Sequence, residues 1–223
     1  MSNDGRIVEA YIGEYASGKS ELAINRALEL RQTFESVTLV DLDFVEPFYT
    51  LRPIKKHLEQ QGLSVVSWER EDTFGLGETG NLVHPATRWV MWRPGHIILD
   101  VGYGVHGAAS LNLVEGVLES PELKVWVVIN IARPITSEVN DIVDYVKGLQ
   151  RADGLINNSH LGDNTTIDFV HQGLRVVEEA GRILNLPIIY TAMTEELARE
   201  GLKAGCDGAK VKTIKRYMPD AMW

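Results

Sequence analysis

The chain alternates short apolar segments with longer segments whose apolar residues recur at helical spacing. The short segments have the length of strands and read RIVEAYI, SVTLVDL, LSVVSW, HIILDV, KVWVVIN, GLINN and LPIIYT. The helical spacing covers SELAINRALELRQTF, TLRPIKKHLEQQ and residues 108–118, 136–150, 166–184 and 194–204. Strands that alternate with helices in this way pair in parallel through right-handed crossovers.

Several of these strands are apolar along their length rather than at every second position. LVDL, IILDV and VWVVI show this pattern, which is typical of strands covered on both faces. The prediction is therefore an α/β fold with three layers, built on a doubly wound, mainly parallel sheet. No linker, internal repeat or low-complexity segment divides the chain, so residues 1–223 are predicted to form a single domain.

Two regions do not follow this alternation. Residues 69–82 carry many charges and glycines and are predicted to form a loop, followed by a short helix in LVHPATRWVMW. The basic segment AKVKTIKRYM is predicted to form a last helix that docks on the core. The pattern leaves the roles of residues 69–92 and of the basic segment open.

Composition narrows the possible partners and compartments. The 22 basic and 31 acidic residues give a net charge of −9, which argues against non-specific binding to nucleic acid or to an anionic membrane but leaves a local basic patch open. Cys206 is the only cysteine, so an internal disulfide is excluded. No apolar run approaches the ~18 residues of a membrane span, and MSNDGR lacks the apolar core of a signal peptide. These features predict a cytoplasmic protein with no membrane span.

The segment GEYASGKS, residues 13–20, matches G-x-x-x-x-G-K-[ST] between a predicted strand and a predicted helix. Its two glycines allow the backbone to curl around an anion, and the first turn of the helix adds free N–H groups. Lys19 would reach the β- and γ-phosphates of a nucleotide, and the Ser20 hydroxyl would bind Mg²⁺. The predicted nucleotide-binding residues are Gly13, Glu14, Tyr15, Ala16, Ser17, Gly18, Lys19, Ser20 and Glu21.

Aspartates follow two of the predicted strands. Asp41 and Asp43 end the strand SVTLVDL, and Asp100 ends HIILDV. The carboxyl ends of parallel strands meet at one edge of the sheet, where ligands bind in open α/β folds. Because Mg²⁺ prefers oxygen ligands, Asp43 and Asp100 are predicted to help hold it, while Asp41 fits a functional acid and a turn residue equally well. Gly102, after Asp100, is predicted to let the backbone approach the γ-phosphate in a loop that senses its loss.

These motifs together resemble the MinD/ParA/CobQ-type ATPases of the SIMIBI class of P-loop NTPases. The resemblance rests on GEYASGKS, VDLDFVEPF, ILDVG and GLINN, and it covers residues 6–193. It implies bound ATP and Mg²⁺, with Lys19, Asp43 and Asp100 as the catalytic residues. It also implies that Asn158, or alternatively Asn157, binds the edge of the base, with residues 191–193 beside it.

The chain departs from these relatives at Glu14. MinD- and ParA-like ATPases have a lysine there that reaches the nucleotide of a dimer partner, whereas a carboxylate would repel the γ-phosphate. Their form of dimer is therefore not expected, although a different homodimer or a protein partner remains possible. The predicted function is a slow Mg²⁺-dependent ATPase that acts as a nucleotide switch. The alternative is an ATP-dependent phosphotransferase or ligase with a small-molecule acceptor.

Overall fold

The computed structural model describes residues 5–43, 51–68, 84–203 and 210–218. Their strands form one parallel sheet of eight, in the order β3-β2-β4-β1-β5-β6-β7-β8. The strands are β1 Val8–Gly13, β2 Val37–Leu42, β3 Ser64–Val66, β4 His96–Val101, β5 Leu123–Ile129, β6 Gly154–Asn157, β7 Ile188–Thr194 and β8 Val211–Ile214. The α-helices are α1 Lys19–Arg31, α2 Lys55–Gln60, α3 Gly104–Ala108, α4 Val139–Lys147, α5 Ile167–Leu184 and α6 Glu195–Lys203.

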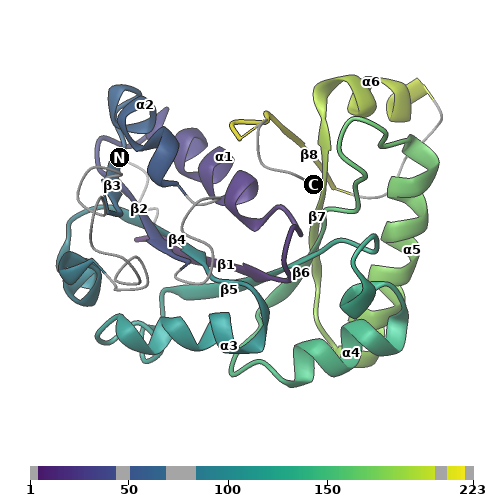
Figure 1. The fold of residues 1–223 in the computed structure, drawn as a ribbon, viewed down its shortest axis with the longest axis horizontal. Coiled ribbons are helices and arrows are strands. Elements are labelled where there is room, and N and C mark those ends of the chain that lie inside the picture. The colour runs from purple at the N-terminus through teal and green to yellow at the C-terminus, as the bar shows by residue number, and fades with distance from the viewer. Residues whose placement is uncertain (1–4, 44–50, 69–83, 204–209, 219–223) are drawn as a thin grey trace, which may run out of the picture.

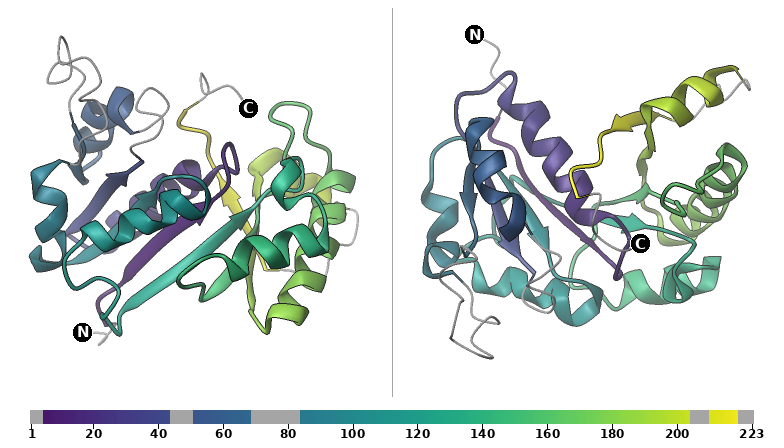
Figure 2. Two further views of the ribbon diagram at one scale, coloured as in Figure 1. Left: turned by 60° about the horizontal axis from the view of Figure 1, so that its bottom comes forward. Right: turned by 45° about the horizontal axis from the view of Figure 1, so that its top comes forward.

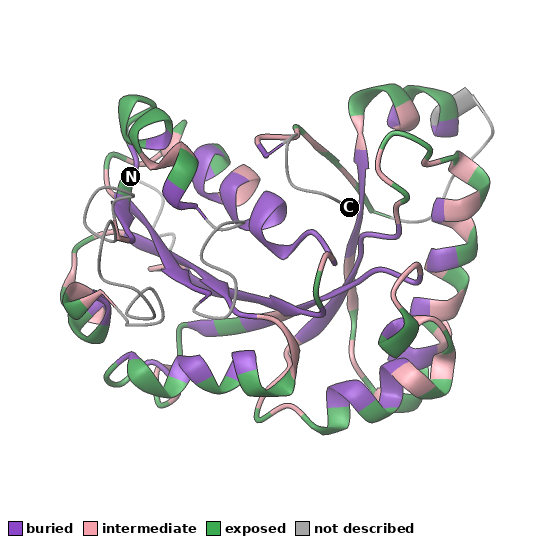
Figure 3. Ribbon diagram, viewed as in Figure 1, coloured by how far each residue is buried: buried purple, intermediate pink, exposed green. Residues whose placement is uncertain are grey.

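Helices cover both faces of the sheet, as the strand pattern predicted (Figure 1; Figure 2). One apolar core joins α1 and α2 to the first face, with Tyr11 and Leu39 among the strand residues. A second core lies under α3, α4 and α5 on the other face, where Ile12 and Leu99 pack. Every residue of β1, β2 and β4 is buried, which explains the lack of alternation in their sequences (Figure 3).

The prediction for the basic C-terminal segment is wrong. Residues 211–214 form β8, which pairs in parallel with β7 from Thr191↔Val211 to Thr194↔Ile214. Three of its four residues, Val211, Thr213 and Ile214, have the β-branched side chains that favour strands. The open edge of β7 supplies the hydrogen bonds, and this tertiary pairing outweighs the helical interpretation of the local sequence.

The helix predicted at residues 108–118 also lies elsewhere. The chain forms α3 at Gly104–Ala108, continues as a 3₁₀ helix over Ala109–Leu113 and leaves helical geometry before Gly116. Gly104 and Gly116 have φ of 72° and 73°, values that L side chains rarely adopt. These two glycines therefore bracket a shorter helical segment than the apolar spacing suggested.

The sheet order brings the predicted site residues to one edge. β1 lies between β4 and β5, and β4 lies between β1 and β2. The loops that follow these parallel strands consequently emerge side by side. In the described part of the chain, no helix has both the length and the apolar character needed to cross a bilayer.

Candidate nucleotide-binding site

The loop from Gly13 to Ser20 is curled tightly between β1 and α1. The Ser17 N–H donates to the Glu14 carbonyl at 3.1 Å, which closes the first turn. Ala16 and Gly18 have φ of 52° and 86°, so left-handed residues alternate with right-handed or extended ones. Such alternation points successive N–H groups toward a common centre and is typical of loops that bind anions.

Both glycines of the motif are needed for steric reasons. A Cβ atom on Gly13 would lie 2.6 Å from the Ser17 Oγ and 2.6 Å from the Val128 carbonyl oxygen. A Cβ atom on Gly18 would lie 2.2 Å from the Asn158 Nδ2. The loop therefore packs against the ends of β5 and β6 at distances that only glycine permits.

Lys19 begins α1 and points toward the acids at the ends of the neighbouring strands. Its Nζ lies 3.8 Å from the Asp43 Oδ2, and both side chains are almost fully buried. The Asp43 N–H donates to the Asp41 Oδ1 at 3.1 Å, which fixes the turn after β2. Asp41 also faces the guanidinium of Arg52, with 4.0 Å between its Oδ2 and the Arg52 Nε. Two cations and two carboxylates thus meet at this edge.

Asp100 completes the acidic group from β4. It is the register partner of Asp41 on β2 and of Tyr11 on β1, and its side chain is fully buried. Neighbours in register project from the same face of a parallel sheet, and Tyr11 packs in the core under α1. The Asp100 carboxyl therefore lies beneath the N-terminus of α1, next to Lys19 and Ser20.

Burial raises the pKa of Asp100 to about 8. The Lys19 ammonium and the Ser20 hydroxyl favour the ionised form, while Asp41 and Asp43 oppose it. Neither carboxylate oxygen accepts a hydrogen bond of ordinary geometry from a described residue. A buried carboxylate in this condition fits a site for a hydrated cation.

The side chains at this site fit a Mg²⁺ ion that is held partly by protein and partly by water and nucleotide phosphates. No group of three His, Cys, Asp or Glu residues in the described ranges forms a complete metal cage. Mg²⁺ retains several waters and needs only one or two protein ligands beside phosphate oxygens. Ser20, Asp43 and Asp100 supply that kind of incomplete set.

Gly102 joins β4 to α3 beside these acids. A Cβ atom there would lie 3.5 Å from the Asp43 Oδ1 and 3.4 Å from the Gly107 Cα. A Cβ atom on Gly107 would in turn lie only 2.3 Å from the Gly102 carbonyl carbon. The predicted switch loop is thus packed backbone against backbone next to Asp43.

Glu14 does not extend from the surface. It is 9% exposed, and its Oε2 accepts a hydrogen bond from the Tyr15 N–H at 3.4 Å. Its charge helps burial to raise the pKa of Tyr145 on α4. Its Oε1 lies 3.5 Å from the position a Cβ on Gly104 would take. The carboxylate is therefore turned toward α3 and α4.

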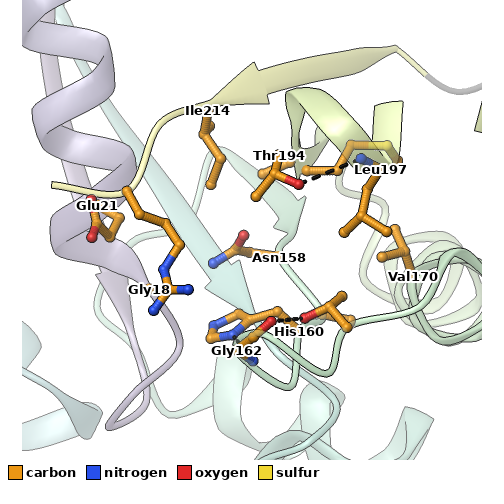
Figure 4. A pocket seen from close by; sticks show the side chains of 14 residues that line it. Gly18, Glu21, Asn158, His160, Gly162, Val170, Thr194, Leu197 and Ile214 are labelled. Atoms are coloured by element: carbon orange, nitrogen blue, oxygen red, sulfur yellow. Dashed lines mark hydrogen bonds between the residues drawn. The ribbon is translucent and has the colours of Figure 1, made fainter. Parts of the chain in front are cut away.

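A pocket adjoins the loop on the side of β6 and β7; we refer to it as the lateral pocket (Figure 4). Its volume is about 510 Å³, including the open mouth. Gly18, Asn158, His160, Val170, Ile214 and Arg216 are among the residues that line it. Ala192 and Met193 also line it, whereas Thr191, predicted beside them, does not appear in its lining.

The two predicted base-binding asparagines are engaged differently. The Asn158 Nδ2 donates to the Ser17 carbonyl at 2.7 Å, so this residue ties the pocket to the loop. Asn157 donates to the Val170 carbonyl and accepts from the N–H and hydroxyl of Ser159, away from the lining of the pocket. Between the two, only Asn158 is placed to contact a ligand in the lateral pocket.

Comparisons with known proteins identify the fold. No protein-family model matches the chain, and no curated protein matches it. The signal recognition particle receptor FtsY from Elizabethkingia anophelis superposes with a TM-score of 0.56 at 14% identity, covering 87% of this chain and 61% of FtsY. The same receptor in complex with GDP gives 0.58 at 14% identity, over 88% and 60%. FtsY from Thermotoga maritima gives 0.55 at 17% identity, over 86% and 63%.

FtsY belongs to the SIMIBI class of P-loop NTPases. This chain has the P-loop NTPase α/β fold. At these identities the likeness concerns the fold, and the chain spans less than two thirds of the length of each of these FtsY structures. The predicted P-loop NTPase fold is confirmed, while the MinD/ParA/CobQ-type branch remains a prediction.

Three residues of this candidate site had no recognisable signal in the sequence. The Asn130 Nδ2 contacts the Ala16 carbonyl at 3.5 Å and the His160 carbonyl at 3.2 Å, so it supports the phosphate loop. Arg52 faces Asp41, and Arg216 reaches the lateral pocket from the far end of the chain. Each acts through a tertiary contact, which neither motif spacing nor periodicity records.

The remaining candidate residues differ in their surroundings. His160 lines the lateral pocket, and burial together with Arg133 and Arg216 lowers its pKa to about 4, so its imidazole is neutral. Glu21 is buried, and its carboxylate accepts the backbone N–H groups of Tyr217 and Met218. Cys206 and Trp223 lie outside the described residues.

Proposed function

We propose that the protein binds ATP with Mg²⁺ in the loop of residues 13–20 and hydrolyses it slowly, as a nucleotide-dependent switch. One observation carries the proposal: the motif GEYASGKS forms a curled loop whose lysine ammonium lies 3.8 Å from Asp43, above the buried Asp100. A lysine and two acids are assembled in this way where a triphosphate and a cation must be bound together.

The residues divide the work as follows under this proposal. Lys19 and the N–H groups of the loop bind the β- and γ-phosphates at the positive end of α1. Ser20, Asp43 and Asp100 hold Mg²⁺, which when bound neutralises charge on the phosphates. Asp43 also orients the attacking water. Gly102 and the backbone that follows it respond to the presence of the γ-phosphate.

The choice of ATP over GTP is part of the proposal. The strand β6 ends in Asn157 and Asn158 followed by Ser159, so the N-K-x-D pattern that recognises guanine is absent from this position. One FtsY structure contains GDP, which is a property of that protein. A direct competition between the two nucleotides is therefore required.

The proposed switch also requires a partner that recognises the nucleotide-bound state. With Glu14 in place of the signature lysine, a partner nucleotide would not be reached from this position. A protein partner or a differently arranged homodimer would read the state of the loops after Asp43 and Asp100. The cytoplasmic location predicted from the sequence belongs to the same proposal.

The first experiment is calorimetric titration of the native chain with MgATP and with MgGTP. Lys19→Ala is expected to weaken MgATP binding at least about 100-fold, because charge-assisted hydrogen bonds to phosphate are lost. Lys147→Ala is the matched control, since Lys147 is exposed at the end of α4. Equal affinity of Lys19→Ala and the native chain would show that the loop does not bind the nucleotide.

The second experiment separates hydrolysis from transfer. Phosphate release by the native chain with MgATP alone is expected at a slow rate that falls further in Asp43→Asn. If ATP is consumed only when a small acceptor is added, and a phosphorylated product accumulates, the phosphotransferase or ligase alternative replaces the switch.

A further inference from the structure

The C-terminal residues 215–218 cross from β8 to α1 beside the lateral pocket. The Asn25 side chain holds Lys215 through two hydrogen bonds, to its carbonyl at 2.8 Å and from its N–H at 2.9 Å. The Glu21 carboxylate accepts the N–H groups of Tyr217 and Met218, with the shortest distances at 2.8 Å. This segment is therefore fastened to the first turns of α1, directly after Lys19 and Ser20.

Arg216 extends between these two anchors and spans the pocket. Its side chain lines the lateral pocket, and its Nη1 forms an ion pair with the Asp163 Oδ1. Asp163 lies in the loop after β6, which forms another wall of the same pocket through His160 and Gly162. The Asp163 side chain is 88% exposed and that of Arg216 is 29% exposed, so the pair lies at the rim.

We propose that the Arg216–Asp163 pair is a clasp that closes the lateral pocket over a nucleotide base. The inference rests on the proposed function, because the pocket adjoins the phosphate loop at Gly18 and Asn158. The clasp must open when a nucleotide enters or leaves, so it sets the rate of exchange. Arg216 is thus a positioning residue for the base.

The chemistry of the pocket suits a flat heteroaromatic ring. Val170, Leu197 and Ile214 give it an apolar lining, and small-ligand sites are typically apolar with a few polar groups. The planar guanidinium of Arg216 can stack on a ring face while its edge pairs with a carboxylate. A ring held between these groups cannot leave without separating Arg216 from Asp163 or displacing the segment anchored on Glu21.

A purely structural ion pair would behave differently. Exposed ion pairs add little to folding stability, so breaking this one should barely change the stability of the chain. A clasp, in contrast, shows its effect in the dissociation rate of the ligand, where small changes of barrier are measured directly. The test therefore compares rates of exchange, with unfolding as a parallel readout.

The experiment measures dissociation of the fluorescent analogue mant-ATP, with Mg²⁺, after mixing with excess ATP in a stopped-flow instrument. Arg216→Gln and Asp163→Asn are each expected to release mant-ATP roughly 3- to 5-fold faster than the native chain, the effect of losing a partly exposed ion pair. The exchanged pair, Asp163→Arg with Arg216→Asp, is expected to recover part of the slow rate, because the ion pair is restored while the guanidinium comes from position 163. Raising the salt concentration should narrow the difference between native and single variants, because salt screens the pair.

The matched control is Arg182→Gln, which breaks a pair with Glu179 on the exposed face of α5. It is expected to leave the dissociation rate unchanged. If both single variants release mant-ATP at the native rate, or if only one of them is faster, the clasp is wrong while nucleotide binding stands. If the native chain binds neither mant-ATP nor ATP, the proposed function fails and the clasp fails with it.

Discussion

Replacing Asp100 with asparagine is expected to stabilise the nucleotide-free protein at neutral pH while it weakens the binding of Mg²⁺ and nucleotide. The carboxyl is fully buried, and neither oxygen accepts a hydrogen bond of ordinary geometry within the described ranges. Ionising it there costs free energy that Lys19 and Ser20 offset only in part and that a bound cation would offset further. Asparagine has nearly the same shape and cannot ionise.

The size of the effect follows from the pKa. Burial raises the pKa of Asp100 from 3.8 to about 8, so between these values the folded protein holds a proton that the unfolded chain releases. Stability is then full below about pH 4 and falls as the pH rises through about 8. One pKa unit corresponds to about 1.4 kcal/mol, so the roughly three units up to pH 7 cost about 4 kcal/mol.

Urea unfolding without nucleotide at pH 5, 6, 7 and 8 measures this cost. The stability of Asp100→Asn relative to the native chain is expected to increase by about 1.4 kcal/mol per pH unit over this range. Asp168→Asn is the control, because Asp168 is exposed in the first turn of α5. If the free energy of unfolding changes with pH in the same way for the native chain and for Asp100→Asn, then burial does not raise the pKa of the Asp100 carboxyl as argued.

Three further substitutions test the packing that holds the site. Gly18→Ala is expected to weaken MgATP binding at least tenfold, as measured by calorimetry. The added Cβ would lie 2.2 Å from the Asn158 Nδ2, and the φ of Gly18 is 86°, which L side chains rarely adopt. Native affinity in this variant would contradict the argument. Thr166→Ala removes the hydroxyl that caps α5 through the Phe169 N–H, so urea unfolding should show a loss of about 1 kcal/mol. Tyr145→Phe removes a buried hydroxyl with no hydrogen-bond partner among the described residues, so it should raise stability by about 1 kcal/mol, and a loss would show that the hydroxyl is satisfied.

Much of the fold could be predicted because strands buried on both faces have continuously apolar sequences. β1, β2 and β4 are buried at every position, and their sequences are correspondingly apolar without alternation. Parallel pairing followed from the helices between them. Each of the seven predicted strand segments overlaps a strand of the structure, although β3 covers only Ser64–Val66.

The eighth strand could not be predicted in the same way. β8 has four residues, half-exposed at an edge, and lies in a basic segment that also suits a helix end. What decides its conformation is the free edge of β7, together with the anchors that Asn25 and Glu21 supply from α1. None of these partners lies within 15 residues of β8 in the sequence, so no local pattern contains the information.

The loop of residues 13–20 and its acids were more predictable than the lateral pocket for a related reason. Asp100 lies near the end of β4, Asp43 directly follows β2, and Lys19 ends the loop after β1; the topology of a parallel sheet brings such strand ends together without further information. The lateral pocket instead depends on side chains of loops and of the C-terminal segment, such as Arg216. Tertiary packing brings these side chains together, and no local sequence pattern predicts those contacts.

The position of Glu14 bears on how a nucleotide switch in this protein would work. Glu14 occupies the position where MinD- and ParA-like ATPases have a lysine that reaches a partner, and its carboxylate is buried, bonded to the Tyr15 N–H and close to Gly104 at the start of α3. The phosphate loop therefore contacts the segment after Asp100 within one chain. Under the proposed function, loss of the γ-phosphate would change both loops together, because a shift of either one moves the carboxylate that lies between them. A signal could then pass to α3 and α4 without a second subunit at the nucleotide, which is a different arrangement from a dimer that shares its nucleotides through a lysine.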